Sequence, residues 1–325
     1  MAALSDPMAA GPALVDLREL SGRELDPLLL EETVEWQTEL DWDFGRSADL
    51  VHQFADMRAL MGSALVDRGE VAGYGYSVVE EHKGLIGDVY VRPPWRHSGN
   101  EVRLLRAILD GLIATPSVRR IEGQLMMVDP AVGRGLQRER FVKVQERMLM
   151  KLDTAALPNL PAGAAARRFP IEPWTDHHHE LAASVISLSY AQHIDSQIND
   201  QYRTVGGAQR FICNIVQYPG CGIFFRQGSF VALDPATGCL AGIVLASLVS
   251  EQVGHITQLC VTPRVKGLGV GYELLRQAIH ALRPHGVRRI SLTVTAANGE
   301  AIRLYERCGF RAVRNFLSYV WEGYR

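Results

Sequence analysis

The sequence predicts an α+β protein with two tandem domains, each a mixed twisted sheet with helices on both faces. Three observations support this prediction. A Pro/Ala/Gly-rich segment without hydrophobic periodicity, residues 154–168, separates two longer segments. These two segments repeat one order of apolar, glycine-rich and amphipathic stretches. Within each copy strands alternate with helices, which is typical of a sheet that helices cover on both sides.

The repeat defines the expected domain boundaries. We expect a loose N-terminal tail over residues 1–12, a first domain over 13–153, a linker over 154–168 and a second domain over 169–325. The chain length of 325 residues agrees with about two domains. The N-terminal tail lacks a basic region followed by an apolar one, so we do not expect it to be a signal peptide.

Composition narrows the class of protein. The net charge of −2 indicates neither a nucleic-acid partner nor an anionic membrane surface, and no apolar run is long enough to span a bilayer. The five cysteines show no CxxC spacing, so neither a disulfide framework nor a metal site is expected. These features predict a reduced, cytoplasmic protein without a metal.

The repeat is clearest around one turn in each copy. The stretch VRPPWRHSG, residues 91–99, follows the apolar run LIGDVYV, and VTPRVKGLG, residues 261–269, follows HITQLCV. Each turn is followed by a segment with the apolar spacing of an amphipathic helix. One constant offset aligns Val91, Pro93, Arg96 and Gly99 with Val261, Pro263, Lys266 and Gly269.

The second of these turns is predicted to bind an anion. Gly267, Gly269 and Gly271 alternate between a predicted strand and a predicted helix. Such a turn leaves backbone N–H groups free to point into one concavity, and the helix start adds its own N–H groups and dipole. Lys266 adds a full positive charge at the edge. A glycine helix cap explains one of these glycines but not three in alternation.

The residues of this turn exclude two common kinds of phosphate-binding loop. A Walker loop needs Gly-Lys-Ser/Thr, which is absent, and a Rossmann fingerprint needs a third glycine where Leu274 stands. The turn Lys266–Gly271 and the segment Asn298–Phe310 instead resemble the two main motifs of the GNAT superfamily of N-acyltransferases. These motifs are Arg/Gln-x-x-Gly-x-Gly/Ala after a strand that carries Val-x-Pro, and Asn-x-x-Ala-x-x-Leu-Tyr-x-x-x-Gly-Phe. Lys266 stands where Arg or Gln is usual.

The resemblance covers most of the chain and implies two tandem GNAT-like domains. It implies an N-acetyltransferase that takes acetyl-CoA as the acyl donor and the amine of a small molecule as the acceptor. It also implies a splay in the sheet within Leu259–Val261, where a backbone N–H stabilises the oxyanion. The residues expected at acetyl-CoA are Leu259, Cys260, Val261, Lys266, Gly267, Leu268, Gly269, Val270, Gly271, Asn298, Ala301 and Tyr305.

The resemblance assigns Tyr305 as the general acid that protonates the leaving thiolate. The alternative is that Tyr305 is a core aromatic residue on an amphipathic helix. Asn298 has two compatible interpretations, a helix N-cap and a polar contact to the pantetheine arm. A ping-pong mechanism through an acyl-cysteine is a weaker alternative, because Cys260 lies on the strand where family members contact the cofactor and its backbone is expected to matter more than its sulfur.

The general base is less visible in the sequence. The candidates are His255 and Glu251, on or before the strand that leads to Cys260, followed by His193 and Asp195. A water relay without a side-chain base is a further alternative.

The two copies differ at the residues that matter for this chemistry. The first copy has Glu101 in place of Gly271, Leu136 in place of Tyr305 and Arg140 in place of Gly309. A carboxylate at the edge of a phosphate site repels the phosphate. We therefore expect the second copy to be catalytic and the first to be degenerate. Two other functions stay open: a regulator or pseudoenzyme that binds acyl-CoA, and a protein lysine acetyltransferase.

Overall fold

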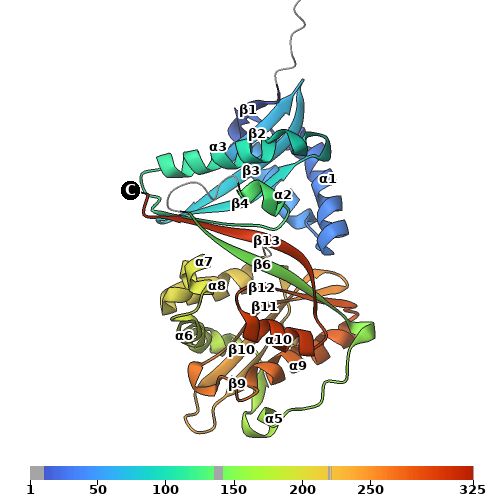
Figure 1. The fold of residues 1–325 in the computed structure, drawn as a ribbon, viewed down its shortest axis with the longest axis vertical. Coiled ribbons are helices and arrows are strands. Elements are labelled where there is room, and N and C mark those ends of the chain that lie inside the picture. The colour runs from blue at the N-terminus through green and yellow to red at the C-terminus, as the bar shows by residue number, and fades with distance from the viewer. Residues whose placement is uncertain (1–10, 135–141, 219, 221, 325) are drawn as a thin grey trace, which may run out of the picture. The chain divides into compact units, whose positions relative to one another are not determined.

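The computed structural model describes residues 11–134, 142–218, 220 and 222–324 (Figure 1). The chain forms two compact units. The first consists of Met1–Gln37, Phe44–Val144 and Leu317–Arg325, and the second of Thr38–Asp43 and Gln145–Phe316. Among the described residues, no helix is both long and apolar enough to cross a lipid bilayer.

The first unit is a sheet with helices on both faces. Its strands follow the order β1-β2-β3-β4-β5-β13. Apolar residues of α3 pack on one face, and those of α1 and α2 belong to a second core on the other face. The elements are β1 (Ala13–Asp16), α1 (Gly22–Leu40), α2 (Gly45–Asp56), β2 (Met61–Asp67), β3 (Glu70–Glu80), β4 (Lys83–Val91), α3 (Asn100–Ala114), β5 (Arg120–Leu125), α4 (Pro130–Arg134) and β13 (Arg311–Glu322).

The second unit repeats this architecture. Its strands follow the order β6-β12-β11-β10-β9-β7, with β8 on β10. The helix α9 packs on one face with residues of α10, and α6 and α8 pack on the other. The elements are β6 (Val142–Asp153), α5 (Ala165–Arg168), β7 (Ile171–Pro173), α6 (His179–Tyr190), α7 (Asp195–Ile198), α8 (Val205–Gln217), β8 (Ile223–Phe224), β9 (Phe230–Leu233), β10 (Leu240–Ser250), β11 (Val253–Val261), α9 (Val270–Leu282), β12 (Arg289–Thr295) and α10 (Gly299–Arg307).

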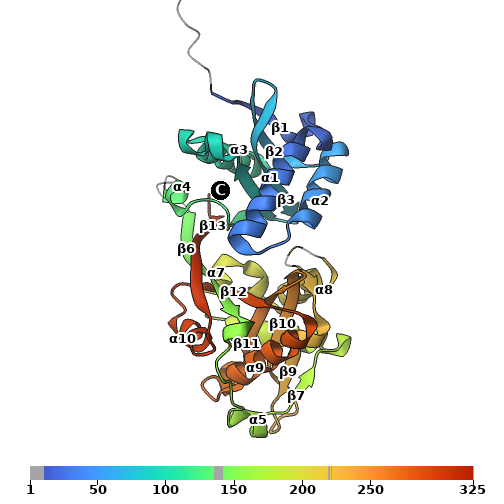
Figure 2. The ribbon, with the colours of Figure 1, turned by 90° about the vertical axis from the view of Figure 1, so that its right-hand side faces the viewer.

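The predicted fold class is confirmed. Each sheet is mixed, since β4–β5 and β11–β12 are parallel pairs and their neighbours are antiparallel. The order of hairpin, strand, turn and helix predicted from the repeat is present in both units, and Figure 2 shows α9 beside the strands of the second unit.

The compact units differ from the continuous domains expected from the sequence, because the last strands of the two copies are exchanged. Leu317–Glu322 of β13 pairs with β5 of the first unit. Arg147–Asp153 of β6 pairs with β12 of the second unit. The segment expected to be a linker also belongs to the second unit, where Leu160 and Ala165 are buried in the core.

Several residues that the sequence analysis used lie outside the described part of the chain. They are residues 1–10 of the expected tail, and Leu136 and Arg140 of the first copy.

The parallel strands of each unit separate at the same place. The strand β11 pairs with β12 only over Val253–Ile256, and Thr257 is bulged against β10. In the first unit β4 pairs with β5 only over Lys83–Ile86, and Gly87 is bulged against β3. A bulge re-aims the strand that carries it. The sheet is therefore splayed beyond Ile256, as the sequence analysis expected.

Candidate active site

The glycine-rich turn of the second unit forms the N-terminus of α9. A short 3₁₀ helix, Pro263–Val265, ends the strand, and the turn then runs to Gly269, the N-cap of α9. Gly269 has a φ of 84° and no side chain caps this end. The first intrahelical bond runs from Glu273 N–H to the Gly269 carbonyl at 3.1 Å, so the preceding N–H groups of the helix remain available to an anion.

The glycines of this turn serve different purposes. Gly267 and Gly269 have φ values of 78° and 84°, which a residue with a Cβ rarely adopts. Gly271 has no such backbone requirement. A Cβ added there would meet Leu304 and Val261 only at 3.8 Å, an ordinary contact. The fold therefore does not need glycine at this position, whereas close approach of a ligand to the helix N-terminus does.

The basic residue of each turn has a different partner. The Nζ atom of Lys266 lies 2.7 Å from Glu300, and both side chains are more than 60% exposed (63% and 64%). A pair that exposed is worth little and opens readily. Arg96 instead donates from its two terminal nitrogens to the carboxylate of Glu35 at 2.7 and 2.6 Å, and from Nε to the Val91 carbonyl at 2.6 Å. The guanidinium of Arg96 therefore hydrogen-bonds to groups of the protein itself.

Beside its own bulge the first unit holds a buried pair of carboxyl groups. Asp88 is buried and directly follows the bulge, at the position that Gln258 occupies in the second unit. Glu32 is fully buried and accepts from the Tyr74 hydroxyl at 2.9 Å. Burial and the neighbouring Asp88 raise the pKa of Glu32 well above its ordinary value. Burial raises the pKa of Asp88 as well, so two carboxyl groups that favour their protonated form occupy the centre of the first unit.

Tyr305 lies on α10 inside the core of the second unit. Its ring contacts Phe310 edge-on, with the centroids 6.0 Å apart. The hydroxyl has no hydrogen-bond partner among the described residues. Burial, with the charge of Asp195, raises the pKa of Tyr305 above the ordinary value, so the phenol carries its proton at neutral pH. Tyr305 is therefore a core aromatic residue with a protonated hydroxyl, and its role as the general acid stays a prediction.

Asn298 connects the tyrosine helix to the segment between α6 and α7. Its Oδ1 accepts from Ala301 N–H at 3.2 Å and caps α10, as the sequence predicts. Its Nδ2 lies 3.2 Å from His193 Nε2, and His193 Nδ1 accepts from Asp195 N–H at 3.2 Å. Asp195 also accepts a hydrogen bond from Thr295. These polar groups engage one another, which favours an anchoring role for His193 and Asp195 over that of a base.

His255 has one ring nitrogen available. It is buried on β11, and its Nδ1 lies 2.9 Å from Ser291 Oγ. The Ser291 hydroxyl donates to the Gly254 carbonyl at 3.3 Å, which assigns the imidazole proton to Nδ1. The Nε2 atom then holds a lone pair and has no partner among the described residues. Burial and the charge of Arg147 lower the pKa of His255 to about 4.

The structure does not bring Glu251 to this cluster. Glu251 lies in the exposed turn between β10 and β11, and its carboxylate is open to solvent. Cys260 is buried, and burial raises the pKa of its thiol to about 12, which leaves almost no thiolate at neutral pH. A nucleophilic role of Cys260 therefore gains no support.

Sequence reasoning missed a polar and aromatic group beside the splay. Gln258 is almost fully buried on β11 and donates from Nε2 to the Tyr190 hydroxyl at 3.0 Å. Tyr190 stacks on Tyr202, with the ring centroids 4.4 Å apart. The signal in the sequence was a glutamine directly before the apolar end of a strand, Leu259–Val261.

Comparisons with known proteins agree with this geometry. The model of the acetyltransferase (GNAT) family matches residues 200–310, which include the turn of α9 and Tyr305. The chain thus has the predicted resemblance to the GNAT acetyltransferase family. It is an N-acetyltransferase, and GNAT enzymes use acetyl-CoA as the donor.

GNAT relatives cover most of the chain. A mycothiol acetyltransferase of Thermobispora bispora is 29% identical over 257 residues, which are 76% of this chain and 78% of the relative. One of Saccharopolyspora erythraea is 26% identical over 280 residues, 81% of this chain and 87% of the relative. A solved tandem GNAT protein from the clavulanic acid biosynthesis pathway shares the fold, with a TM-score of 0.59, 16% identity and coverage of 95% and 98%.

We predict that Gly271→Glu abolishes acetyl-CoA binding without loss of stability. The 3.8 Å clearance leaves room for the Cβ, but a carboxylate would face the donor's phosphates. Two like unit charges about 4 Å apart repel each other by about 4 kcal/mol at an effective dielectric constant of about 20. We therefore expect the Kd for acetyl-CoA to increase by at least about 100-fold. Isothermal titration calorimetry measures Kd, and circular dichroism measures Tm.

Gly271→Ala is the matched control. It adds the Cβ without the charge, so it should weaken binding less than Gly271→Glu and leave Tm unchanged. Unaltered acetyl-CoA affinity in Gly271→Glu would show that the donor binds elsewhere.

Proposed function

We propose that the second unit transfers the acetyl group of acetyl-CoA to the primary amine of a small molecule by direct attack. The observation that carries the proposal is the combination, within one unit, of a splayed β11, an uncapped α9 N-terminus and the protonated hydroxyl of Tyr305. The first unit keeps the splay, but its turn carries Glu101, and its Arg96 is already hydrogen-bonded to Glu35. We therefore assign catalysis to the second unit alone.

Each residue has one task in the proposed reaction. His255 Nε2 accepts a proton from the incoming amine, directly or through one water. A backbone N–H of the splayed part of β11 donates to the oxyanion of the tetrahedral intermediate. When the C–S bond breaks, Tyr305 donates its proton to the thiolate, whose thiol has an ordinary pKa of about 8.5. The phenolate then regains a proton from water, and the amide product leaves.

We further propose that the acceptor is mycothiol without its acetyl group. The support is that relatives named mycothiol acetyltransferase cover 76% and 81% of this chain, including both copies of the repeat. The low identities of 29% and 26% leave the acceptor to be tested directly.

The acceptor assay separates the three candidate functions. The full chain is incubated with acetyl-CoA and either deacetylated mycothiol or a lysine-containing peptide, and mass spectrometry measures acetylated product. We expect one acetyl group on the amine of deacetylated mycothiol and none on the peptide. Peptide acetylation would indicate a protein acetyltransferase, and tight acetyl-CoA binding without any product would indicate a regulator.

We predict that Tyr305→Phe lowers kcat by about 10²–10⁴-fold, the usual range for loss of a general acid. The ring and its contact with Phe310 remain, so the affinity for acetyl-CoA should stay within about twofold. Steady-state kinetics and calorimetry measure the two quantities. Tyr218→Phe, which removes a hydroxyl from a 62% exposed tyrosine, is the control and should leave kcat unchanged. A fully active Tyr305→Phe enzyme would exclude the acid role.

A further inference from the structure

A short segment from the first half of the sequence belongs to the second unit. We call Thr38–Asp43 the strap; it begins in the last turn of α1 and ends before α2. Asp41 within it has a φ of 60°, a left-handed conformation that a residue with a side chain seldom adopts. Such a backbone persists only when its surroundings hold it in place.

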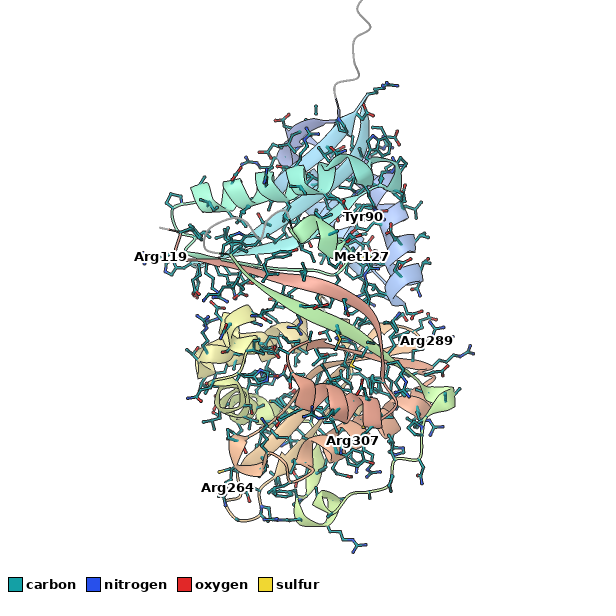
Figure 3. The ribbon with its side chains drawn as sticks, in the orientation of Figure 1. Tyr90, Arg119, Met127, Arg264, Arg289 and Arg307 are labelled. Atoms are coloured by element: carbon teal, nitrogen blue, oxygen red, sulfur yellow. The ribbon has the colours of Figure 1, made fainter. Side chains whose placement is uncertain are left out.

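Polar contacts at Asp41 and Asp43 hold the strap. Lys151 Nζ donates to Asp41 Oδ2 at 2.7 Å, and the Arg289 guanidinium binds the same carboxylate. Asp43 N–H donates to the Val249 carbonyl at 2.8 Å. Lys151 and Arg289 lie on β6 and β12, so the strap is tied to adjacent strands of the second sheet; Figure 3 labels Arg289.

These anchors place Trp42 on the proposed base. The indole of Trp42 lies against the imidazole of His255, with ring centroids 5.1 Å apart and an interplanar angle of 58°. His255 is only 5% exposed. Because Ser291 of β12 binds Nδ1 and Trp42 packs on the ring, the imidazole is held by two different elements.

We infer that the strap is part of the second unit's catalytic centre, and that Trp42 is a positioning residue that orients the His255 ring and shields it from water. The inference rests on the proposed role of His255 as the base. It also assigns a function to the first half of the chain that does not require the first turn to bind acetyl-CoA.

The protonation of His255 reports on this shielding. The groups that face the imidazole are the Trp42 ring from the strap, Ser291 from β12, the paired residue Ser247 from β10 and the charge of Arg147 from β6. Burial is the larger cause of the pKa of about 4, and Arg147 adds to it. Without the indole, water reaches the ring and the pKa should rise toward the ordinary value of about 6.5.

The test follows His255 by NMR in the full chain, with ¹³C-labelled histidine and with His255→Gln to assign its signal. We expect a titration midpoint near pH 4 in the unmodified protein. Trp42→Ala should raise the midpoint by at least about one pH unit. Trp42→Phe keeps an aromatic ring on the imidazole and should move the midpoint less than half as far. Asp41→Asn, which weakens the ionic anchors, should shift it in the same direction.

The same variants have a kinetic consequence. Only neutral His255 can accept a proton, so the rate falls as pH drops through its pKa. The acid limb of the kcat profile should therefore move to higher pH in Trp42→Ala and less than half as far in Trp42→Phe. Trp95→Ala, which removes a tryptophan bonded to Asp67 in the first unit, is the control and should leave both profiles unchanged.

Two results overturn the inference. One is a His255 midpoint in folded Trp42→Ala equal to that of the unmodified protein, with Tm by circular dichroism as the folding check. The other is an equal shift in Trp42→Phe and Trp42→Ala. Failure of the proposed base role gives a different result, which is full acetyl transfer by His255→Gln.

Discussion

The candidate site depends on where β11 stops pairing with β12. The two strands share a parallel ladder only over Val253–Ile256, and the bulge at Thr257 turns β11 away beyond that point. A full ladder would use the backbone groups of β11 within the sheet. The splay ends this ladder in the unit that also holds the uncapped N-terminus of α9 and the buried hydroxyl of Tyr305. These are the groups to which we assign the oxyanion, the phosphates and the proton of the proposed reaction.

The two units show how one backbone supports different chemistry. Both keep the bulge and the splay, at Gly87 and Thr257. The difference lies in the side chains: Asp88 and Glu32 lie buried at the centre of the first unit, and Gln258 takes the place of Asp88 in the second. Burial raises the pKa of both carboxyl groups in the first unit, whereas the amide of Gln258 does not titrate and donates to Tyr190. The two copies therefore differ in these side chains while they keep the same fold.

The sequence predicted what depends on local pattern. The turn of α9, the cap at Asn298 and the position of Tyr305 on its helix follow from residue spacing within short segments. The strand exchange did not, because β6 and β13 occupy equivalent places in the repeat and nothing in their own residues identifies the neighbouring strand. Register and partner depend on the whole sheet.

The strap was equally invisible in the sequence. Its Asp41 and Trp42 look like a polar connection between two helices, and only their contacts with Lys151 and His255 give them a role. The same limit applies to the base candidates. Glu251 and His255 are close in sequence, but a turn exposes the first and the sheet buries the second.

The most direct test of the account is the number of acetyl-CoA molecules bound per chain, measured by native mass spectrometry on the full-length protein. Because Arg96 is held by Glu35 and Glu101 stands at the first turn, while no side chain caps the α9 N-terminus, we predict one molecule per chain. Two molecules bound with similar affinity would contradict the assignment of the donor site to the second unit alone.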